Sequence, residues 1–286
     1  MITDVEGVIS LIKQLGISSW SYPWAIGVPG YPIPKNPLTA VGLLEKAKTL
    51  GVDVVQIADN LPLHRLSTAE LEELRNTADE YGIKLEIGTR GVQPDHLRQY
   101  LAIAKFLNSG LLRTLTHTIE SQPDLAQIEA WLREVLPDFA AAGVVIALEN
   151  YERHSAAELA DLVRKIDHPA LGVCLDTVNN FGALEGPEVV LNTLAPYVLN
   201  LHIKDFAIAR IDTAMGYLVT GKPAGEGRLN VPDVIKLLNR NNRAINIILE
   251  LWPPYQNSVE ATIQNEAEWV ERSITYLKSA LKQARS

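Results

Sequence analysis

Four side chains of the kinds that bind metal ions each stand at or near the end of a short apolar run in the second half of the chain. Glu149 closes the run ALE, Asp176 closes CLD, His202 stands in LHI and Glu250 closes ILE. Three carboxylates and an imidazole that converge would be costly to leave unpaired, and a divalent cation relieves that cost. Oxygen and nitrogen ligands suit Mn²⁺, Mg²⁺, Co²⁺ or Zn²⁺. The pattern therefore predicts one divalent metal site. The alternative is that each carboxylate caps a helix or pairs with a lysine.

Other polar and aromatic residues near these runs are candidates for substrate binding. Glu86 and Arg90 alternate along one face of an expected strand, and Lys204 shares a face with His202. Glu86 has an alternative role as the partner of Arg113 in an ion pair inside the fold. Lys204 has an alternative role in a salt bridge to one of the carboxylates. The aromatic candidates are Trp20 and Trp252, whose rings suit the apolar face of a sugar but also suit core packing.

The elements that must position these residues recur about every thirty residues: a helical stretch, a glycine, then a short β-rich run. The glycines are Gly16, Gly51, Gly82, Gly110, Gly143 and Gly172. A left-handed glycine is a common end to a helix, so we expect each to stop one. The expected strands are 17–20, 52–57, 83–87, 111–115, 144–148, 171–175, 198–203 and 245–251. Near-continuous apolar runs of this kind fit strands buried on both faces of a parallel sheet.

Helix signals lie between these strands. Ser67 with Glu70, and Ser155 with Glu158, read as capping boxes. Pro94 and Pro123 suit first helical turns, and the last helix carries an apolar stripe at 3.6-residue spacing. Eight such units predict an α/β fold, a (β/α)₈ TIM barrel formed as a single domain by residues 1–286. The rival is a doubly wound open sheet, but no G-x-G-x-x-G motif follows the first strand.

Composition narrows the function classes. The chain has 26 basic and 34 acidic residues, a net charge of −8 and one cysteine, Cys174. The single cysteine excludes an intrachain disulfide, and we expect it to be a small buried residue. The acidic balance argues against nucleic-acid binding. The first residues, with Asp4 and Glu6, do not resemble a targeting segment, and no apolar run is long enough to span a membrane. We expect a cytoplasmic protein that acts on a small-molecule carbohydrate or cyclitol substrate. The sequence is also compatible with a homo-oligomer.

The runs ALEN, LDT, LHIKD and LE that carry the four metal-ligand candidates resemble the xylose isomerase-like TIM-barrel superfamily, the sugar phosphate isomerase/epimerase family. The resemblance spans essentially the whole chain. It implies a carbohydrate-directed enzyme with a metal bound to the four residues. Asn179 stands where ketose epimerases and endonuclease IV of this superfamily have a substrate- or metal-contacting histidine, and Glu226 lies in a GEG motif that resembles an active-site feature. Both are therefore added to the substrate-binding candidates.

The leading functional prediction is a metal-dependent isomerase or epimerase of a small sugar, sugar phosphate or related polyhydroxy carbonyl compound. In this scheme Glu149 and Glu250 are the catalytic pair that removes and returns a proton through an enediolate. The same four ligands serve a dehydratase of the inosose or dehydroshikimate type, which expels a β-hydroxyl. A third alternative, from a different class, is a non-catalytic barrel that binds a metal or a sugar.

Overall fold

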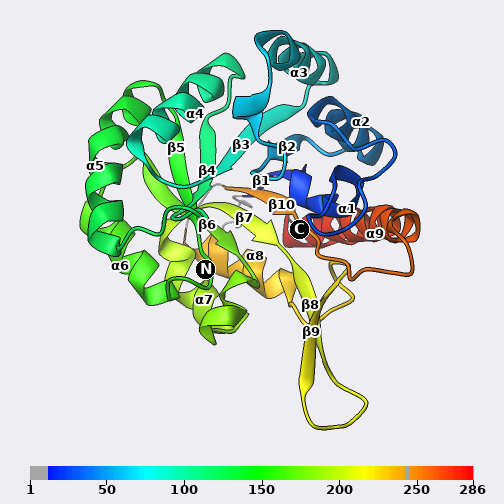
Figure 1. Ribbon diagram of the computed structural model, residues 1–286. Helices are drawn as coiled ribbons and strands as arrows, with labels where there is room; N and C mark the ends of the chain where they lie inside the picture. Colours follow the sequence, from blue (N-terminus) through cyan, green and yellow to red (C-terminus); the bar gives the residue numbers. More distant parts are fainter. Residues whose placement is uncertain (1–11, 242–244, 286) are drawn as a thin grey trace, which may run out of the picture.

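The computed structural model describes residues 12–241 and 245–285, and these form a closed barrel of parallel strands surrounded by helices (Figure 1). The strands hydrogen-bond in the order β1-β10-β7-β6-β5-β4-β3-β2 and back to β1. Their bounds are β1 (Ile12–Ser18), β2 (Val54–Ile57), β3 (Lys84–Arg90), β4 (Leu111–Leu115), β5 (Val145–Glu149), β6 (Leu171–Asp176), β7 (Val198–Ile203) and β10 (Ile245–Leu249). This confirms the predicted single (β/α)₈ barrel domain. Asp4 and Glu6, which bear on targeting, lie outside the described residues.

Helices cover the outer face of the barrel and bury its apolar side chains. They are α1 (Pro23–Ile26), α2 (Ala40–Leu50), α3 (Thr68–Tyr81), α4 (Pro94–Phe106), α5 (Leu125–Ala141), α6 (Ala156–Ile166), α7 (Pro187–Leu194), α8 (Val231–Arg240) and α9 (Val259–Arg285). Both predicted capping boxes are present at the starts of α3 and α6, and Pro94 opens α4. The expectation for Pro123 is wrong, because Asp124 caps α5 and the proline precedes that cap.

The glycines that mark the thirty-residue period do two different things. Gly51 and Gly82 end α2 and α3 in the left-handed conformation, as expected. Gly16 and Gly172 instead lie inside β1 and β6, where a Cβ atom would come within 2.4 Å and 2.5 Å of neighbouring atoms. These two glycines permit close approach of adjacent strands rather than ending helices. The left-handed residue at the end of α6 is Asp167.

Two long connections follow strands β1 and β7. The first begins with a 3₁₀ turn at Ser19–Ser21, which Ser18 caps, so β1 ends earlier than the expected strand at 17–20. The second forms a hairpin of β8 (Asp205–Arg210) and β9 (Tyr217–Lys222), which projects from the barrel in Figure 1. This hairpin was not among the elements expected from the sequence.

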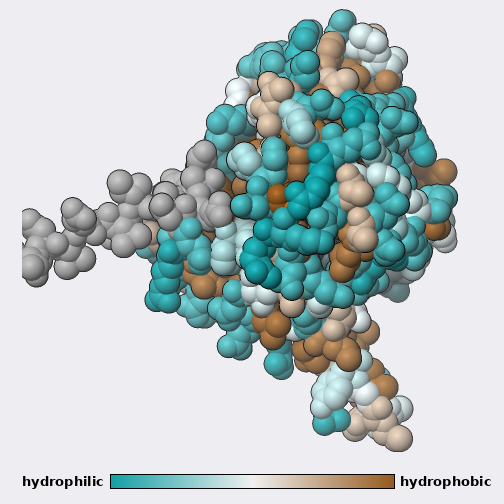
Figure 2. Space-filling view, turned by 90° about the vertical axis from the view of Figure 1, so that its left-hand side faces the viewer, coloured by the Kyte–Doolittle hydropathy of each residue, from teal (hydrophilic) through white to brown (hydrophobic). Residues whose placement is uncertain are grey.

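The molecular surface over the elements drawn at the left of Figure 1 is mainly hydrophilic. Figure 2 shows this face, with hydrophobic side chains gathered near the base of the projecting hairpin. Within the hairpin, Met215, Tyr217 and Leu218 are exposed. Among the described helices, none combines the length and the apolar character that a membrane span requires.

Candidate metal centre

Glu149, Asp176, His202 and Glu250 converge at the carboxyl end of the barrel. Each offers one ligand atom, and these four atoms all lie within 4.8 Å of one another. His202 Nδ1 is 3.3 Å from Glu250 Oε1, 3.5 Å from Glu149 Oε2 and 3.9 Å from Asp176 Oδ2. All four side chains are buried. The sequence prediction that these residues meet is confirmed.

Strand register explains the convergence. Asp176 on β6 pairs with His202 on β7, and His202 pairs in turn with Ile248 on β10. Glu250 lies two residues beyond Ile248, directly after the end of β10, and so faces the same interior as Ile248. Glu149 ends β5, the strand next to β6. Parallel strands bring their carboxyl ends to one face of the barrel, which is where barrel enzymes build their sites.

A buried amide fixes the tautomer of His202. Gln56 Nε2 donates to Glu86 and to Asn200, so Gln56 must present its carbonyl oxygen to the imidazole. Gln56 Oε1 lies 2.8 Å from His202 Nε2, which therefore carries the proton. Burial opposes a charge on the ring, but Cys174, Glu250 and Glu149 raise the pKa of His202 well above its ordinary value. A cation at this centre would displace the proton from Nδ1, the atom that faces the three carboxylates, and so free its lone pair as a ligand.

Asp176 is oriented by its neighbours so that one oxygen remains available. Asn150 accepts from the backbone N–H of Asp176 at 2.7 Å and donates to its carbonyl at 2.9 Å. Asp176 Oδ1 accepts the backbone N–H groups of Val178 and Asn179. Its Oδ2 has no hydrogen-bond partner among the described residues. The side chain is thus held with Oδ2 directed at the centre.

Glu149 is engaged through both of its oxygens. Arg113 Nε donates to Oε2, and Asn179 Nδ2 donates to Oε1 at 2.6 Å. Burial opposes the charge on Arg113, but the carboxylates of Glu149 and Asp59 hold its pKa well above the usual value. Arg113 therefore remains a fixed cation beneath Glu149.

Glu250 has a different environment. Neither of its oxygens has a hydrogen-bond partner among the described residues, although Lys204 Nζ lies 2.9 Å from Oε2. Burial would raise the pKa of Glu250, but His202 and Lys204 hold it well below its ordinary value. Burial likewise opposes the ammonium of Lys204, while Asp176, 2.8 Å away, and Glu250 raise its pKa. Lys204 is therefore both on the pocket wall and in the salt bridge named as its alternative role.

The unpartnered atoms test whether this cluster suits a metal ion. His202 Nδ1, Asp176 Oδ2 and both oxygens of Glu250 are buried without a hydrogen bond within the described residues. Lys204 forms ion pairs with Asp176 Oδ2 and Glu250 Oε2, so His202 Nδ1 and Glu250 Oε1 are the atoms left for a divalent cation to satisfy. One nitrogen and several carboxylate oxygens form a donor set that fits a divalent ion.

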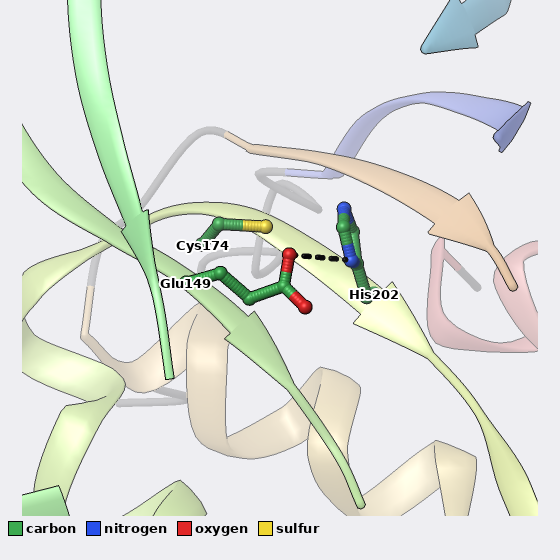
Figure 3. A group of neighbouring side chains, drawn as sticks. All are labelled: Glu149, Cys174 and His202. Atoms are coloured by element: carbon green, nitrogen blue, oxygen red, sulfur yellow. Dashed lines mark ion pairs between the residues drawn. The ribbon is translucent and has the colours of Figure 1, made fainter. Parts of the chain in front are cut away.

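A fifth buried side chain adjoins the cluster. Figure 3 shows the Cys174 thiol directed toward Glu149 and His202, whose ion pair is marked. The sulfur, Glu149 and His202 also form a group of donor atoms within 4.8 Å. Burial raises the pKa of the Cys174 thiol to about 12, so the thiol stays protonated at neutral pH. The prediction that Cys174 is a buried strand residue is confirmed.

A pocket of about 390 Å³ opens beside the centre. Five of the predicted substrate-binding residues line it: Trp20, Arg90, Asn179, Lys204 and Trp252. Arg113 and Tyr151 line it too, as does Glu149. Trp20 donates through Nε1 to Asp59, and Trp252 donates to the Asp205 carbonyl, so both rings are held in place. The candidate binding site is therefore continuous with the candidate metal centre.

Glu86 lies elsewhere. The amides of Gln56, Asn200 and Asn246 donate to its carboxylate in the barrel interior, and burial raises its pKa. It does not line the pocket beside the metal ligands. The expected ion pair between Glu86 and Arg113 is also wrong, because Arg113 pairs with Glu149 and Asp59.

Glu226 also lies outside this pocket. Its exposed carboxylate is 3.4 Å from Arg272 on α9. The flanking glycines have a structural purpose, since Asp205 accepts the N–H groups of Gly225 and Gly227. A Cβ atom on Gly227 would lie 2.1 Å from the Asp205 carboxylate. The GEG motif thus follows from the anchoring of its backbone, which explains the motif without a role for Glu226 in binding.

Asp59 and Tyr151 were missed as site residues by the sequence analysis. Asp59 lies after β2 and pairs with Arg90 and Arg113, while Tyr151 lies after β5 on the pocket wall. Their positions just beyond strand ends could have indicated a role. Their partners come from other strands, so the local sequence did not reveal the network.

Comparisons with known proteins agree with this geometry. The family model for the xylose isomerase-like TIM barrel matches residues 44–280. The chain is 39% identical over 265 residues to the 3-oxo-isoapionate decarboxylase of Pectobacterium atrosepticum, covering 92% of this chain and 94% of that protein. It is 26% identical over 189 residues to the D-psicose 3-epimerase of Ruminiclostridium cellulolyticum, covering 56% and 64%.

Solved structures share the fold. A xylose isomerase-like TIM barrel protein from Mycobacterium smegmatis in complex with magnesium superposes with a TM-score of 0.65 at 18% identity, covering 96% of this chain and 99% of that one. A D-psicose 3-epimerase with D-tagatose from Clostridium cellulolyticum gives 0.67 at 20% identity, covering 96% and 98%. With a closed eight-stranded barrel and a family match over most of its length, this chain belongs to the xylose isomerase-like TIM barrel family.

Proposed function

We propose that this protein is a metal-assisted lyase that removes CO₂ from a small 3-oxo sugar acid. The relative that shares 39% of residues over nearly the full length is described as a decarboxylase of such an acid. In a 3-oxo acid the carbonyl lies β to the carboxylate. Loss of CO₂ therefore leaves an electron pair that the carbonyl takes up as an enolate, which is the charge that this kind of site stabilises.

The observation that carries the proposal is the unequal engagement of Glu149 and Glu250. Glu149 accepts hydrogen bonds through both oxygens, whereas Glu250 accepts none among the described residues and faces the Lys204 ammonium. A two-base epimerase needs two carboxylates that are free to take a proton from opposite faces. Decarboxylation breaks a C–C bond and requires no base to remove a proton from carbon. It needs only stabilisation of charge and a proton donor.

The residues on the pocket wall supply these functions. The bond between the carboxylate carbon and C2 breaks, CO₂ leaves, and the electron pair moves to give the enolate of the C3 carbonyl. A cation held by Glu149, Asp176, His202 and Glu250 would, when bound, lower the energy of the negative charge on that carbonyl oxygen. Lys204 Nζ then donates a proton to C2, which gives the ketone. Asp176 and Glu250 hold Lys204 in place for this transfer.

A second candidate is the sugar epimerase or isomerase predicted from the sequence. It is favoured by the proximity of Glu149 and Glu250 to the same atom, His202 Nδ1, at 3.5 Å and 3.3 Å. The similarity to a D-psicose 3-epimerase also supports it, although that match covers 56% of this chain. In that scheme Asn179 would have to release Glu149 before the carboxylate could act as a base.

The two candidates give different products from the same assay. Metal-loaded protein is incubated in D₂O with small 3-oxo sugar acids and, separately, with ketoses and cyclitol ketones. The proposal predicts release of CO₂ and one deuterium on the former C2 of the acid, which is the carbon next to the carbonyl in the ketone product. Deuterium exchange or epimer formation in a ketose without CO₂ release would support the epimerase instead. An ultraviolet-absorbing enone would indicate a dehydratase, and no reaction with any substrate would favour a binding barrel.

A further inference from the structure

Three cationic side chains line the pocket, and two of them are already bound. Arg113 donates to Glu149, to Asp59 and to the carbonyl of Thr89. Lys204 lies within 2.9 Å of two carboxylates. Arg90 is different: its Nε is buried and has no hydrogen-bond partner among residues 12–241 and 245–285. Arg90 is therefore the cationic side chain on this wall whose hydrogen-bond donors remain available to a ligand.

Asp59, the acid that forms an ion pair with Arg90, compensates its charge only in part. Asp59 Oδ2 lies 3.3 Å from Arg90 Nε. The other oxygen of Asp59 accepts from Arg113 at 2.8 Å and from Trp20 at 3.3 Å. Asp59 is thus shared between two guanidinium groups and an indole. It orients Arg90 and leaves the face of the guanidinium fork that is turned away from it available for another oxyanion.

Two aromatic side chains, Tyr151 and His117, lie near Arg90. Tyr151 on the pocket wall has its ring 5.9 Å from the Arg90 guanidinium. His117, just past β4, packs against Tyr151 with ring centroids 5.7 Å apart, and its buried Nδ1 lacks a hydrogen bond. Burial, together with the charges of Arg90 and Arg153, lowers the pKa of His117 to about 4. Burial is the main cause, so His117 is neutral, and Arg90 and Arg153 supply the positive charge that would attract an anion to this corner.

Strand register places Arg90 at the same level along the barrel as the metal-ligand cluster, the name used here for Glu149, Asp176, His202 and Glu250. Arg90 on β3 pairs with Leu115 on β4, and Thr114 pairs with Leu148 on β5. Arg90 therefore lies level with Glu149, two strands away, or about 10 Å between backbones. A small acyclic sugar acid and the long arginine side chain can span that distance together.

We propose that Arg90, with Tyr151 beside it, forms an oxyanion subsite that holds the carboxylate of an acyclic polyhydroxy substrate while its oxygens reach Glu149, Asp176, His202 and Glu250. This inference rests on the proposed function, because it assigns the carboxylate of the 3-oxo acid to Arg90. Asp59 gives the subsite a further property. When the carboxylate leaves as neutral CO₂, Arg90 keeps Asp59 as its partner and is not left unpaired.

Equilibrium binding tests the subsite without turnover. The probes are erythronate, erythritol and erythritol 4-phosphate, titrated into Mg²⁺-loaded protein by calorimetry, because none of them can lose CO₂ as a 3-oxo acid does. We expect erythronate to bind more tightly than erythritol. Arg90→Gln should weaken erythronate binding about 10- to 100-fold and leave erythritol binding unchanged. Arg164→Gln, an exposed change on α6 where the native arginine pairs with Asp161, is the matched control and should change neither.

Each outcome bears on the subsite separately from the reaction. Equal binding of erythronate and erythritol, or an Arg90→Gln variant that keeps the preference for erythronate, would overturn the inference. Preference for erythritol 4-phosphate alone would overturn the carboxylate assignment and indicate a phosphate. Acid binding that depends on Arg90 in a protein that releases no CO₂ would refute the proposed function and leave the subsite intact. CO₂ release that does not depend on Arg90 would support the proposed function and refute the subsite.

Discussion

Lys204 competes for the same carboxylates that would bind the cation. Its ammonium lies 2.8 Å from Asp176 and 2.9 Å from Glu250, and both carboxylates are fully buried. A divalent ion placed beside those oxygens would be repelled by this charge. The proposed function also makes Lys204 the proton donor, so one side chain has opposite effects on metal affinity and on turnover.

Replacing Lys204 with methionine should separate these effects. Lys204→Met keeps most of the apolar stem and removes the charge, so we expect divalent metal to bind at least as tightly as in the wild type. Product formation should fall by roughly 10²–10⁴-fold, the usual value of a positioned acid. Lys165→Met, an exposed change on α6, is the control. Weaker metal binding with unchanged turnover would show that both assignments are wrong.

Glu266 illustrates a residue whose type conflicts with its position. It lies on the apolar stripe of α9, fully buried, where its carboxylate accepts the backbone N–H groups of Trp24 at 2.7 Å and Ala25 at 3.0 Å. These bonds tie α9 to the connection after β1, which contains the pocket residue Trp20. Burial raises the pKa of Glu266 to about 8, and the two N–H groups oppose this rise only in part.

The raised pKa predicts a pH-dependent stability. Between the ordinary glutamate pKa of 4.5 and about 8, the native state holds a proton that the unfolded chain has lost. The contribution of Glu266 to the free energy of unfolding therefore falls as pH rises through that window, by at most about 1.4 kcal/mol per pH unit. Urea unfolding of wild type and Glu266→Gln across this range should show the difference shrinking with pH. A difference that stays constant, as expected for the exposed control Glu268→Gln, would contradict the assignment.

At the scale of elements, the connection after β7 is held by one carboxylate. Asp205 is buried and accepts four backbone N–H groups, those of Phe206, Gly225, Gly227 and Leu229, at 2.8 to 2.9 Å. It therefore closes the base of the hairpin onto the barrel. Its sequence position three residues after His202 suggests a ligand, but its oxygens are used up by the backbone.

Removal of this anchor should destabilise the fold rather than the metal centre. Asp205→Ala leaves four N–H groups without their acceptor, so we expect a loss of about 2–4 kcal/mol in the free energy of unfolding. Denaturant unfolding measures this. Asp233→Ala, at an exposed cap of α8, should cost about 1 kcal/mol or less. A change of that smaller size at Asp205 would mean that the four bonds contribute little.

Local sequence signals predicted the elements where the cause is local. The capping boxes at Ser67 and Ser155 involve residues three apart, and both form as expected. Gly16 and Gly172 were misread because their reason is contact with an adjacent strand, which local spacing does not contain. The same limit explains Glu86 and Glu226, whose partners lie on other strands and on α9.

At the scale of the whole molecule, eight repeated units made the barrel predictable, and the barrel made the metal-ligand cluster predictable. Once parallel strands close, residues at their carboxyl ends must face one another, so Glu149, Asp176, His202 and Glu250 could be brought together from sequence. The direction in which each functional group points could not be predicted from the sequence. The hydrogen bond from Asn179 to Glu149 and the free donors of Arg90 depend on side-chain positions set by several strands at once.

The central claim is that these four residues form one divalent cation site. Calorimetric titration of Mn²⁺ into chelator-treated protein tests it most directly, with thermal unfolding as a parallel readout. We predict one saturable site per chain and a melting temperature that rises with metal, because the cation binds the folded state. Asp176→Ala should abolish or greatly weaken binding, whereas Asp161→Ala on the surface of α6 should not. No saturable binding in the wild type, or equal binding in the Asp176→Ala protein, would contradict the account.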